Sequence, residues 1–270
     1  MEFYQTLQNI LMASVPTEKI NLFKDFYITY KCGEIEYESS SKVIVFDNPS
    51  YANFCILSDP KEVPRRNKLN TPYGQKLLLH AIAHIEYSAI DLALDAVYRF
   101  RDCGTGFEKD WLEVAEDEVR HFEMIEGLLR ELGSYYGEYP VHDALFEASM
   151  RTLDLDERMA VVPRYLEANG LDATPLILKK LYPYRHDLMI QKIIAALNVI
   201  LHEEIDHVRK GDVWFEFACN KAMKELSSYF EIIDKHYPNS FPRKININCT
   251  ARREAGFKND ELARISLASC

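Results

Sequence analysis

Apolar residues recur along most of the chain with the spacing of amphipathic helices. From residue 71 onward they return every three or four positions, which places them on one face of a helix. This rhythm predicts four long helical regions, over residues 71–102, 106–132, 143–169 and 186–219. We expect the third region to end at Gly170 and to be bent or broken at Pro163, because proline cannot donate a backbone hydrogen bond. The pattern therefore predicts an all-α protein built around a four-helix bundle.

The first seventy residues follow a different pattern. Residues 2–14 predict a short amphipathic helix that stops before Pro16, and residues 35–37 and 42–46 are expected to be short extended segments. Further helices are expected near residues 221–237 and 258–267. The predicted division is residues 1–70 as an N-terminal arm packing on the bundle, 71–220 as the bundle, and 221–270 as C-terminal helices and a tail.

Composition and charge narrow the class of protein. Of the 270 residues, 47% are hydrophobic, and 10 glycines and 11 prolines are too few for a turn-rich β protein. The net charge of −10 gives no general attraction to phosphate backbones, so nucleic acid is a disfavoured partner. The one basic stretch, Arg243-Lys244 with Arg252-Arg253, is interpreted as a solvated tail.

The spacing of the cysteines and the pattern of apolar residues indicate the cellular compartment of the protein. The six cysteines are scattered at irregular intervals, which predicts reduced thiols. The chain after Met1 lacks the basic and apolar regions of a signal peptide, and no uncharged stretch is long enough to span a membrane. We therefore expect a cytoplasmic protein with no membrane partner.

Two of the long helices carry the same polar motif within their apolar face. Glu118 and His121 form Glu-x-x-His in the second helix, and Glu204 and His207 form it in the fourth. Residues three apart lie on one helical face, so each pair replaces two buried apolar residues. Unpaired buried charge is costly, and a bound metal is one way to offset that cost.

The other two helical regions each offer one glutamate. Glu86 lies on the apolar face of the first, and Glu167 lies one turn beyond Pro163 in the third. Four carboxylates and two imidazoles are the ligands with which di-iron and di-manganese bundles hold their ions. The predicted metal ligands are Glu86, Glu118, His121, Glu167, Glu204 and His207. The expected cofactor is two iron ions, with manganese or a mixed pair as alternatives.

Several residues near these positions receive plainer interpretations. His84 lies roughly opposite Glu86 on the helix and is expected to be a packing or surface residue rather than a ligand. Asp91 is expected to be solvated or paired. Trp111 lies ten residues before His121 and Trp214 lies seven residues after His207, where electron transfer is an alternative to the favoured core packing.

Longer stretches of the sequence resemble a known family. They are His80–Glu86 continuing through Ala89–Ala93 to Arg99-Phe100, Asp110–Leu112, Glu118 with His121-Phe122, Met159–Arg164, Leu166–Ala168, Gly170–Pro175, Glu204-Ile205 with His207-Val208, Ala251-Arg252 and Ala255–Phe257. In this order they resemble the bacterial domain-of-unknown-function 455 family of the ferritin-like di-iron superfamily, over roughly residues 60–262. The resemblance implies a ferritin-like bundle with a di-iron site at the six positions above. It implies no particular reaction.

Four functions remain open from the sequence. The first is an oxygen-activating oxidoreductase, an oxidase or hydroxylase with dioxygen and a small-molecule substrate as its partners. The second is iron storage, or the handling of iron and peroxide, which the irregular arm and extra C-terminal helices disfavour. A weaker similarity to the di-iron tRNA hydroxylases leaves tRNA modification as the third. The fourth is a metal-free structural bundle. The oligomeric state and the substrate are open.

Overall fold

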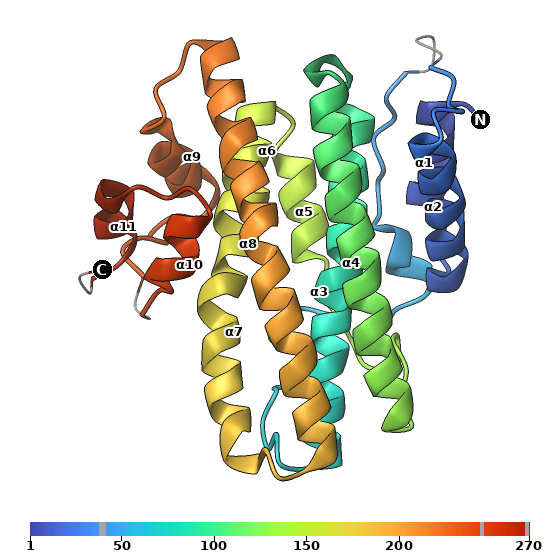
Figure 1. Cartoon of the computed structure of the whole chain (residues 1–270), viewed down its shortest axis with the longest axis vertical. Coiled ribbons are helices and arrows are strands. Elements are labelled where there is room, and N and C mark those ends of the chain that lie inside the picture. The colour runs from blue at the N-terminus through green and yellow to red at the C-terminus, as the bar shows by residue number, and fades with distance from the viewer. Residues whose placement is uncertain (38–41, 244–245, 268–269) are drawn as a thin grey trace. The chain divides into compact units, whose positions relative to one another are not determined.

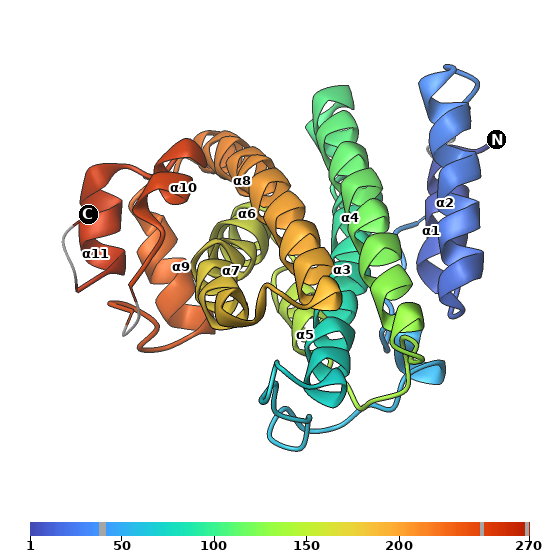
Figure 2. The same cartoon turned by 60° about the horizontal axis from the view of Figure 1, so that its bottom comes forward.

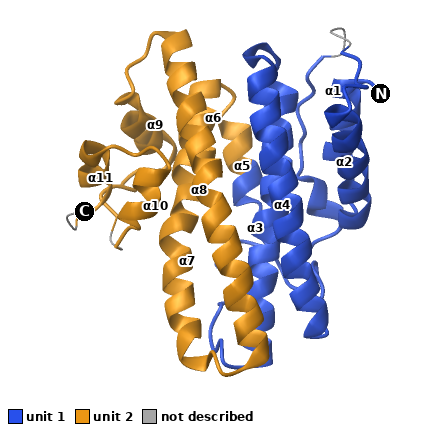
Figure 3. Cartoon of the chain, viewed as in Figure 1, with its two compact units in different colours: residues 1–146 blue, residues 147–270 orange. Residues whose placement is uncertain are grey.

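The computed structural model describes all residues except 38–41, 244–245 and 268–269, and the described residues contain helices joined by turns and loops, with no strand among them (Figure 1). The all-α prediction is therefore confirmed. The chain divides into two compact units, residues 1–146 and 147–270 (Figure 3). A single ferritin-like bundle over 71–220, between an N-terminal arm and a C-terminal part, stays a prediction.

Unit 1 is organised around two long helices that pack side by side along their length (Figures 1 and 2). Its elements are α1 (Phe3–Met12), α2 (Pro16–Lys31), α3 (Pro72–Arg99), α4 (Thr105–Glu131), short 3-10 turns at Ser50–Asn53 and Arg101–Cys103, and the start of α5 (Ala144–Arg151). The hydroxyl of Thr71 accepts a hydrogen bond from the Gly74 amide at 3.2 Å, and Pro72 follows at the first helical position. This cap explains why α3 begins where the sequence predicts.

α3 is also the most apolar of the long helices. An 18-residue window within it has a mean hydropathy of 1.3, so by length and composition alone it could cross a membrane. However, 83% of that window is buried inside the structure, which is the environment of a core helix. Its apolar residues are therefore accounted for by packing within the protein.

The N-terminal segment differs from the sequence prediction. α1 is present, but a second helix, α2, begins at Pro16, where the sequence analysis expected only a stop. Proline suits the first position of a helix because that position needs no amide donor. Of the two expected extended segments, residues 35–37 contribute one isolated bridge, between Glu2 and Glu36, and residues 42–46 form no strand.

A buried ion pair joins α2 to α3. The ammonium group of Lys19 is fully buried, pairs with the carboxylate of Asp91 and donates a hydrogen bond to Ser50 Oγ at 2.8 Å. Ser50 in turn donates to Asp91 Oδ2 at 2.6 Å. Burial lowers the pKa of Lys19 and raises the pKa of Asp91, so each charge depends on the other. Asp91 is thus paired, one of the two states expected for it.

Unit 2 contains the second set of long helices, in which α7 and α8 run side by side (Figures 1 and 2). Its elements are the end of α5, α6 (Leu155–Val161), a π-helical segment (Val162–Glu167), α7 (Ala168–Leu181), a 3-10 turn (Tyr182–Tyr184), α8 (Leu188–Ala222), α9 (Ser228–His236), α10 (Cys249–Glu254) and α11 (Asn259–Ile265). α8 matches the fourth predicted helix closely.

The third predicted helical region is the least regular. The break expected at Pro163 is a π-helical segment, in which the wider turn accommodates the missing proline donor. Gly170 does not end the helix, since α7 continues through it and through Pro175 to Leu181. The prediction of a helix end at Gly170 was wrong because no special backbone angle is required there.

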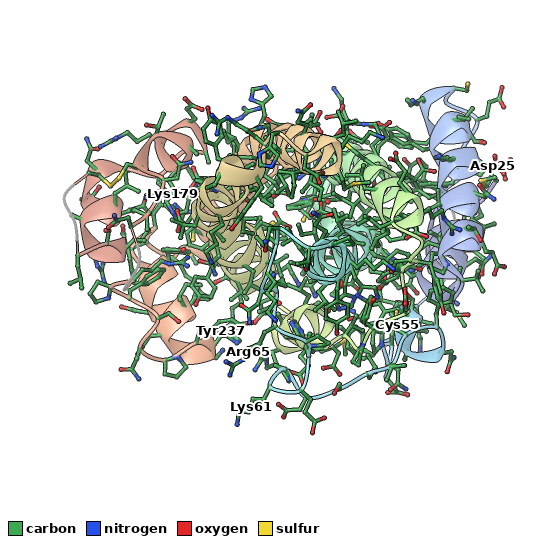
Figure 4. The ribbon with its side chains drawn as sticks, turned by 90° about the horizontal axis from the view of Figure 1, so that it is seen from below. Asp25, Cys55, Lys61, Arg65, Lys179 and Tyr237 are labelled. Atoms are coloured by element: carbon green, nitrogen blue, oxygen red, sulfur yellow. A yellow bond between two sulfur atoms is a disulfide. The ribbon has the colours of Figure 1, made fainter. Side chains whose placement is uncertain are left out.

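The C-terminal part also corrects the prediction of reduced thiols. Cys249, at the start of α10, forms a disulfide with Cys270, drawn as a yellow bond in Figure 4. The free cysteines are Cys32, Cys55, Cys103 and Cys219. The argument for a cytoplasmic location from reduced thiols is weakened accordingly, and that location stays a prediction.

Candidate metal centre

Three of the predicted ligands meet inside unit 1. Glu86 comes from α3, while Glu118 and His121 come from one face of α4, and all three side chains are buried. His121 Nδ1 lies 3.2 Å from Glu86 Oε2 and 3.4 Å from Glu118 Oε2. One ligand atom from each residue lies within 4.8 Å of those of the others, so these three side chains could hold a metal ion.

The electrostatics of this group favour a bound positive charge. Burial alone lowers the pKa of His121, but hydrogen bonds and negative charge from Glu118 and Glu86 outweigh it and raise the pKa to about 11. The imidazole of the metal-free protein therefore carries a proton that offsets the two carboxylates. A metal cation could take over this role by displacing the proton, since metal binding to histidine requires the neutral ring.

The remaining three predicted ligands belong to unit 2. Glu204 and His207 lie on α8, with 3.8 Å between Glu204 Oε1 and His207 Nδ1, and the side chain of His207 is fully buried. Glu167 is the last residue of the π-helical segment, which packs against α8, and its side chain is half-buried. Unit 2 thus repeats the composition found in unit 1, a Glu-x-x-His pair and one further glutamate.

A close approach of two backbones sets the register between the π-helical segment and α8. A Cβ atom placed on Gly211 would overlap Cβ and Cγ of Pro163, so any other residue there would force the surrounding atoms to shift. Gly211 lies one turn after His207 on α8, and Pro163 lies one turn before Glu167. This contact fixes how the two elements of unit 2 that carry the predicted ligands lie against each other. The irregularity at Pro163 was predictable from the sequence, whereas its contact with Gly211 was not.

The donor set suits a particular class of metal. Each unit offers two carboxylates and one imidazole, and these oxygen and nitrogen ligands are typical of iron and manganese rather than of metals that prefer thiolates. In unit 1 the burial of all three side chains also limits the access of water to them. The residues present therefore fit the predicted pair of ions.

The plainer interpretations of His84 and Trp111 agree with the structure, whereas core packing is not confirmed for Trp214. His84 is buried, with Nε2 donating to the carbonyl of His142 at 2.7 Å and Nδ1 accepting from the Tyr136 hydroxyl at 2.9 Å. Both ring nitrogens of His84 thus form hydrogen bonds within the protein. Trp111 is buried in the core of unit 1, and the half-buried ring of Trp214 lies 5.1 Å from that of Phe217.

Several buried arginines lie around the π-helical segment and were not predicted from the sequence. Arg252 is 1% exposed and pairs with Asp172 of α7, so the prediction of a solvated basic tail was wrong for it. Arg243 pairs with the same carboxylate at 3.2 Å, while Lys244 lies outside the described residues. Arg164, inside the π-helical segment, is buried as well. No local pattern reveals such pairs, because the partners are far apart along the chain.

Comparison with known proteins places the chain in a family. A family model described as a protein of unknown function, DUF455, matches residues 12–263. An uncharacterized protein of Haemophilus influenzae is 37% identical over an alignment of 273 residues. The alignment covers 97% of this chain and 92% of that protein. No solved structure matches the chain. A match over nearly the whole length, together with a full-length relative, shows that the chain belongs to the DUF455 family.

Proposed function

We propose that this protein is a di-iron carboxylate protein that activates dioxygen and oxidises an organic substrate. The observation that supports this most is the position of His121 Nδ1 between two buried carboxylates, 3.2 and 3.4 Å away. Such an arrangement is costly for folding unless a cation or proton sits among the three groups.

We further propose that the two ligand groups serve one dinuclear centre of a ferritin-like bundle. Glu86, Glu118 and His121 would supply one side, and Glu167, Glu204 and His207 the other. The support is chemical: the same composition is repeated in each unit, and two histidines with four glutamates match two divalent ions in charge and number.

Within such a centre the residues have distinct tasks. The two histidines would supply nitrogen ligands and the four glutamates would supply carboxylate ligands. Two iron ions would supply the capacity to bind and reduce dioxygen. The burial of Glu118 and His121 excludes water from the ligands and so strengthens every charge interaction in the site.

The first experiment is metal loading without oxygen. We expect the purified chain to bind about two ferrous ions and to show a change in absorbance when oxygen is admitted. Glu118→Gln and His121→Gln should lose binding, whereas Glu123→Gln, a control at an exposed position of α4 that pairs with Lys24, should not. A wild-type chain that binds no iron or manganese would refute the proposal.

The same preparation separates the storage alternative. A large hollow assembly that takes up many irons per chain would indicate storage, whereas a fixed stoichiometry near two would favour an oxidoreductase. Retention of the fold without any metal, in both the wild type and Glu118→Ala, would instead favour a structural bundle.

A further inference from the structure

We propose that the C-terminal helices α10 and α11 hold Glu167 in its ligand position, with Arg252 and Arg164 as positioning residues. This inference rests on the proposed role of Glu167 as a metal ligand. It gives a function to a part of the chain that carries no ligand of its own.

Arg252 fastens the first turn of α7, which begins directly after Glu167. Its Nη2 donates to the carbonyl of Ala168 at 3.1 Å and to Asp172 Oδ2 at 2.7 Å, and its Nε donates to Asp172 Oδ1 at 3.1 Å. The guanidinium of Arg252 therefore forms a bidentate ion pair with the carboxylate of Asp172, which is the strongest and most directional form of an arginine–carboxylate interaction. Both side chains are almost fully buried.

The segment before α10 adds to this attachment. The backbone amide of Asn248 donates to Asp172 Oδ1 at 2.8 Å, and its side-chain amide donates to the carbonyl of Leu171 at 3.3 Å. Arg243 contributes a further ion pair to Asp172. The backbone just after Glu167 is therefore bound at Ala168, Leu171 and Asp172 by one short stretch of the C-terminal region.

Arg164 fastens the other side of Glu167, within the π-helical segment. It pairs with Asp212 of α8 at 2.8 Å and donates to Glu261 of α11 at 2.9 Å. The hydroxyl of Tyr229 donates to the Arg164 carbonyl at 3.1 Å. The segment is thus tied both to α8, which carries Glu204 and His207, and to α11.

One aromatic ring connects the two arginines. The ring centroid of Phe257 lies 4.7 Å from the guanidinium carbon of Arg164 and 5.0 Å from that of Arg252. A guanidinium group is attracted to the face of an aromatic ring. Phe257 therefore links the ion pairs of Arg164 and Arg252 into one cluster. Phe257 lies just after α10 and precedes α11, so it joins the two helices of the C-terminal region as well.

The chemistry of these contacts favours positioning over bulk stability. Burying a charged pair brings little net stability compared with apolar packing, whereas it fixes a geometry closely. A π-helical turn is also a rare backbone form, often found at functional sites. Two buried arginines on either side of Glu167 are therefore better explained by a need to hold that carboxylate in place.

The test measures metal affinity rather than turnover. Cobalt(II), which reports its coordination by visible absorbance, is titrated into the full chain, and the dissociation constant, the number of ions and the spectrum are recorded. Arg252→Met should weaken at least one ion by about tenfold or more and alter its spectrum, as loss of a ligand-orienting contact commonly does. Arg252→Lys should recover only part of the affinity, because lysine cannot form the two parallel bonds.

Two controls separate positioning from general loss of stability. Arg158→Met removes another buried arginine of unit 2, which donates to the carbonyl of Ser149 at 2.7 Å, and Arg253→Met removes an exposed arginine of α10. Both should bind cobalt within about twofold of the wild type, even if Arg158→Met melts earlier. Asp172→Asn, similar in shape to the natural residue, serves if Arg252→Met does not fold, and it should weaken binding in the same way.

The outcomes distinguish the positioning role from the proposed function. If the wild type binds cobalt and both Arg252→Met and Asp172→Asn bind it equally well, the positioning role is wrong while the metal site stands. An equal loss of affinity in Arg158→Met would also overturn the positioning role. Failure of the wild type itself to bind would refute the metal site, and the positioning role with it.

Discussion

Replacing Gly211 with alanine is the sharpest test of the packing around the π-helical segment. The new Cβ would overlap two atoms of the Pro163 ring, and a proline ring cannot rotate away as a flexible side chain can. Overpacking of this kind typically costs about 1–3 kcal/mol, because backbone or neighbouring side chains must shift. This cost is partly offset, because alanine stabilises the interior of a helix by about 1 kcal/mol relative to glycine.

Gly170→Ala supplies the matched control. Gly170 lies in α7, also in unit 2, and a Cβ there would meet no atom within 4 Å. Both variants gain helix propensity, so the difference between their free energies of unfolding isolates the clash with Pro163. We expect Gly170→Ala to be slightly more stable than the wild type, and Gly211→Ala to be about 1–3 kcal/mol less stable than Gly170→Ala.

Urea denaturation followed by circular dichroism measures this difference. Equal midpoints for the two variants, with unchanged slopes, would show that α8 and the π-helical segment do not approach this closely. If the approach also fixes the ligand geometry, Gly211→Ala should weaken cobalt binding as well, because Gly211 lies one turn from His207.

Three further perturbations concern buried polar groups and the disulfide. Burial lowers the pKa of His80 from 6.5 to about 4, so between these values the unfolded chain binds more protons. The free energy of unfolding of the wild type should then fall by up to about 3 kcal/mol as the pH drops from 6.5 to 4. The urea midpoint of His80→Gln should fall less than that of the wild type over the same pH range. Identical pH profiles for the two proteins would contradict this. Asp91→Asn leaves the ammonium of Lys19 buried without its counter-charge, which should cost about 3–5 kcal/mol in chemical denaturation; a loss below about 1 kcal/mol, the usual value of an exposed pair, would count against the buried pair. The disulfide Cys249–Cys270 closes a separation of 21 residues, so Cys270→Ser should lower the free energy of unfolding by about 3 kcal/mol; alkylation of all six cysteines in the unreduced, denatured chain would show that the bond does not form.

The long helices were predictable because several local signals coincide in each. α3 has a capping threonine and a proline at its start, and its buried face repeats over 28 residues. The same proline signal was misread at Pro16, where a helix begins rather than ends. Proline alone does not distinguish the two cases, since it is unfavourable inside a helix yet suited to its first turn.

The cluster of Glu86, Glu118 and His121 in unit 1 was predictable for a different reason. Glu118 and His121 interrupt an apolar face at helical spacing, and Glu86 does the same on α3, so placing the two helices side by side brings the three together. Arg252 and Asp172 were not predictable, because they lie 80 residues apart and neither interrupts a regular pattern. Their pairing is decided by tertiary folding, whereas the local charge pattern alone indicates a solvated tail.

The π-helical segment has a consequence for comparing related sequences. A π turn holds one residue more than an α turn, and each extra residue rotates the rest of the helix by about 100°. An alignment of this chain with a regular α-helix would therefore need a one-residue gap within Val162–Glu167. If the gap were placed after Glu167, the comparison would match this carboxylate to a position on another side of the helix. Deleting one residue from the segment should likewise turn Glu167 away from its present face.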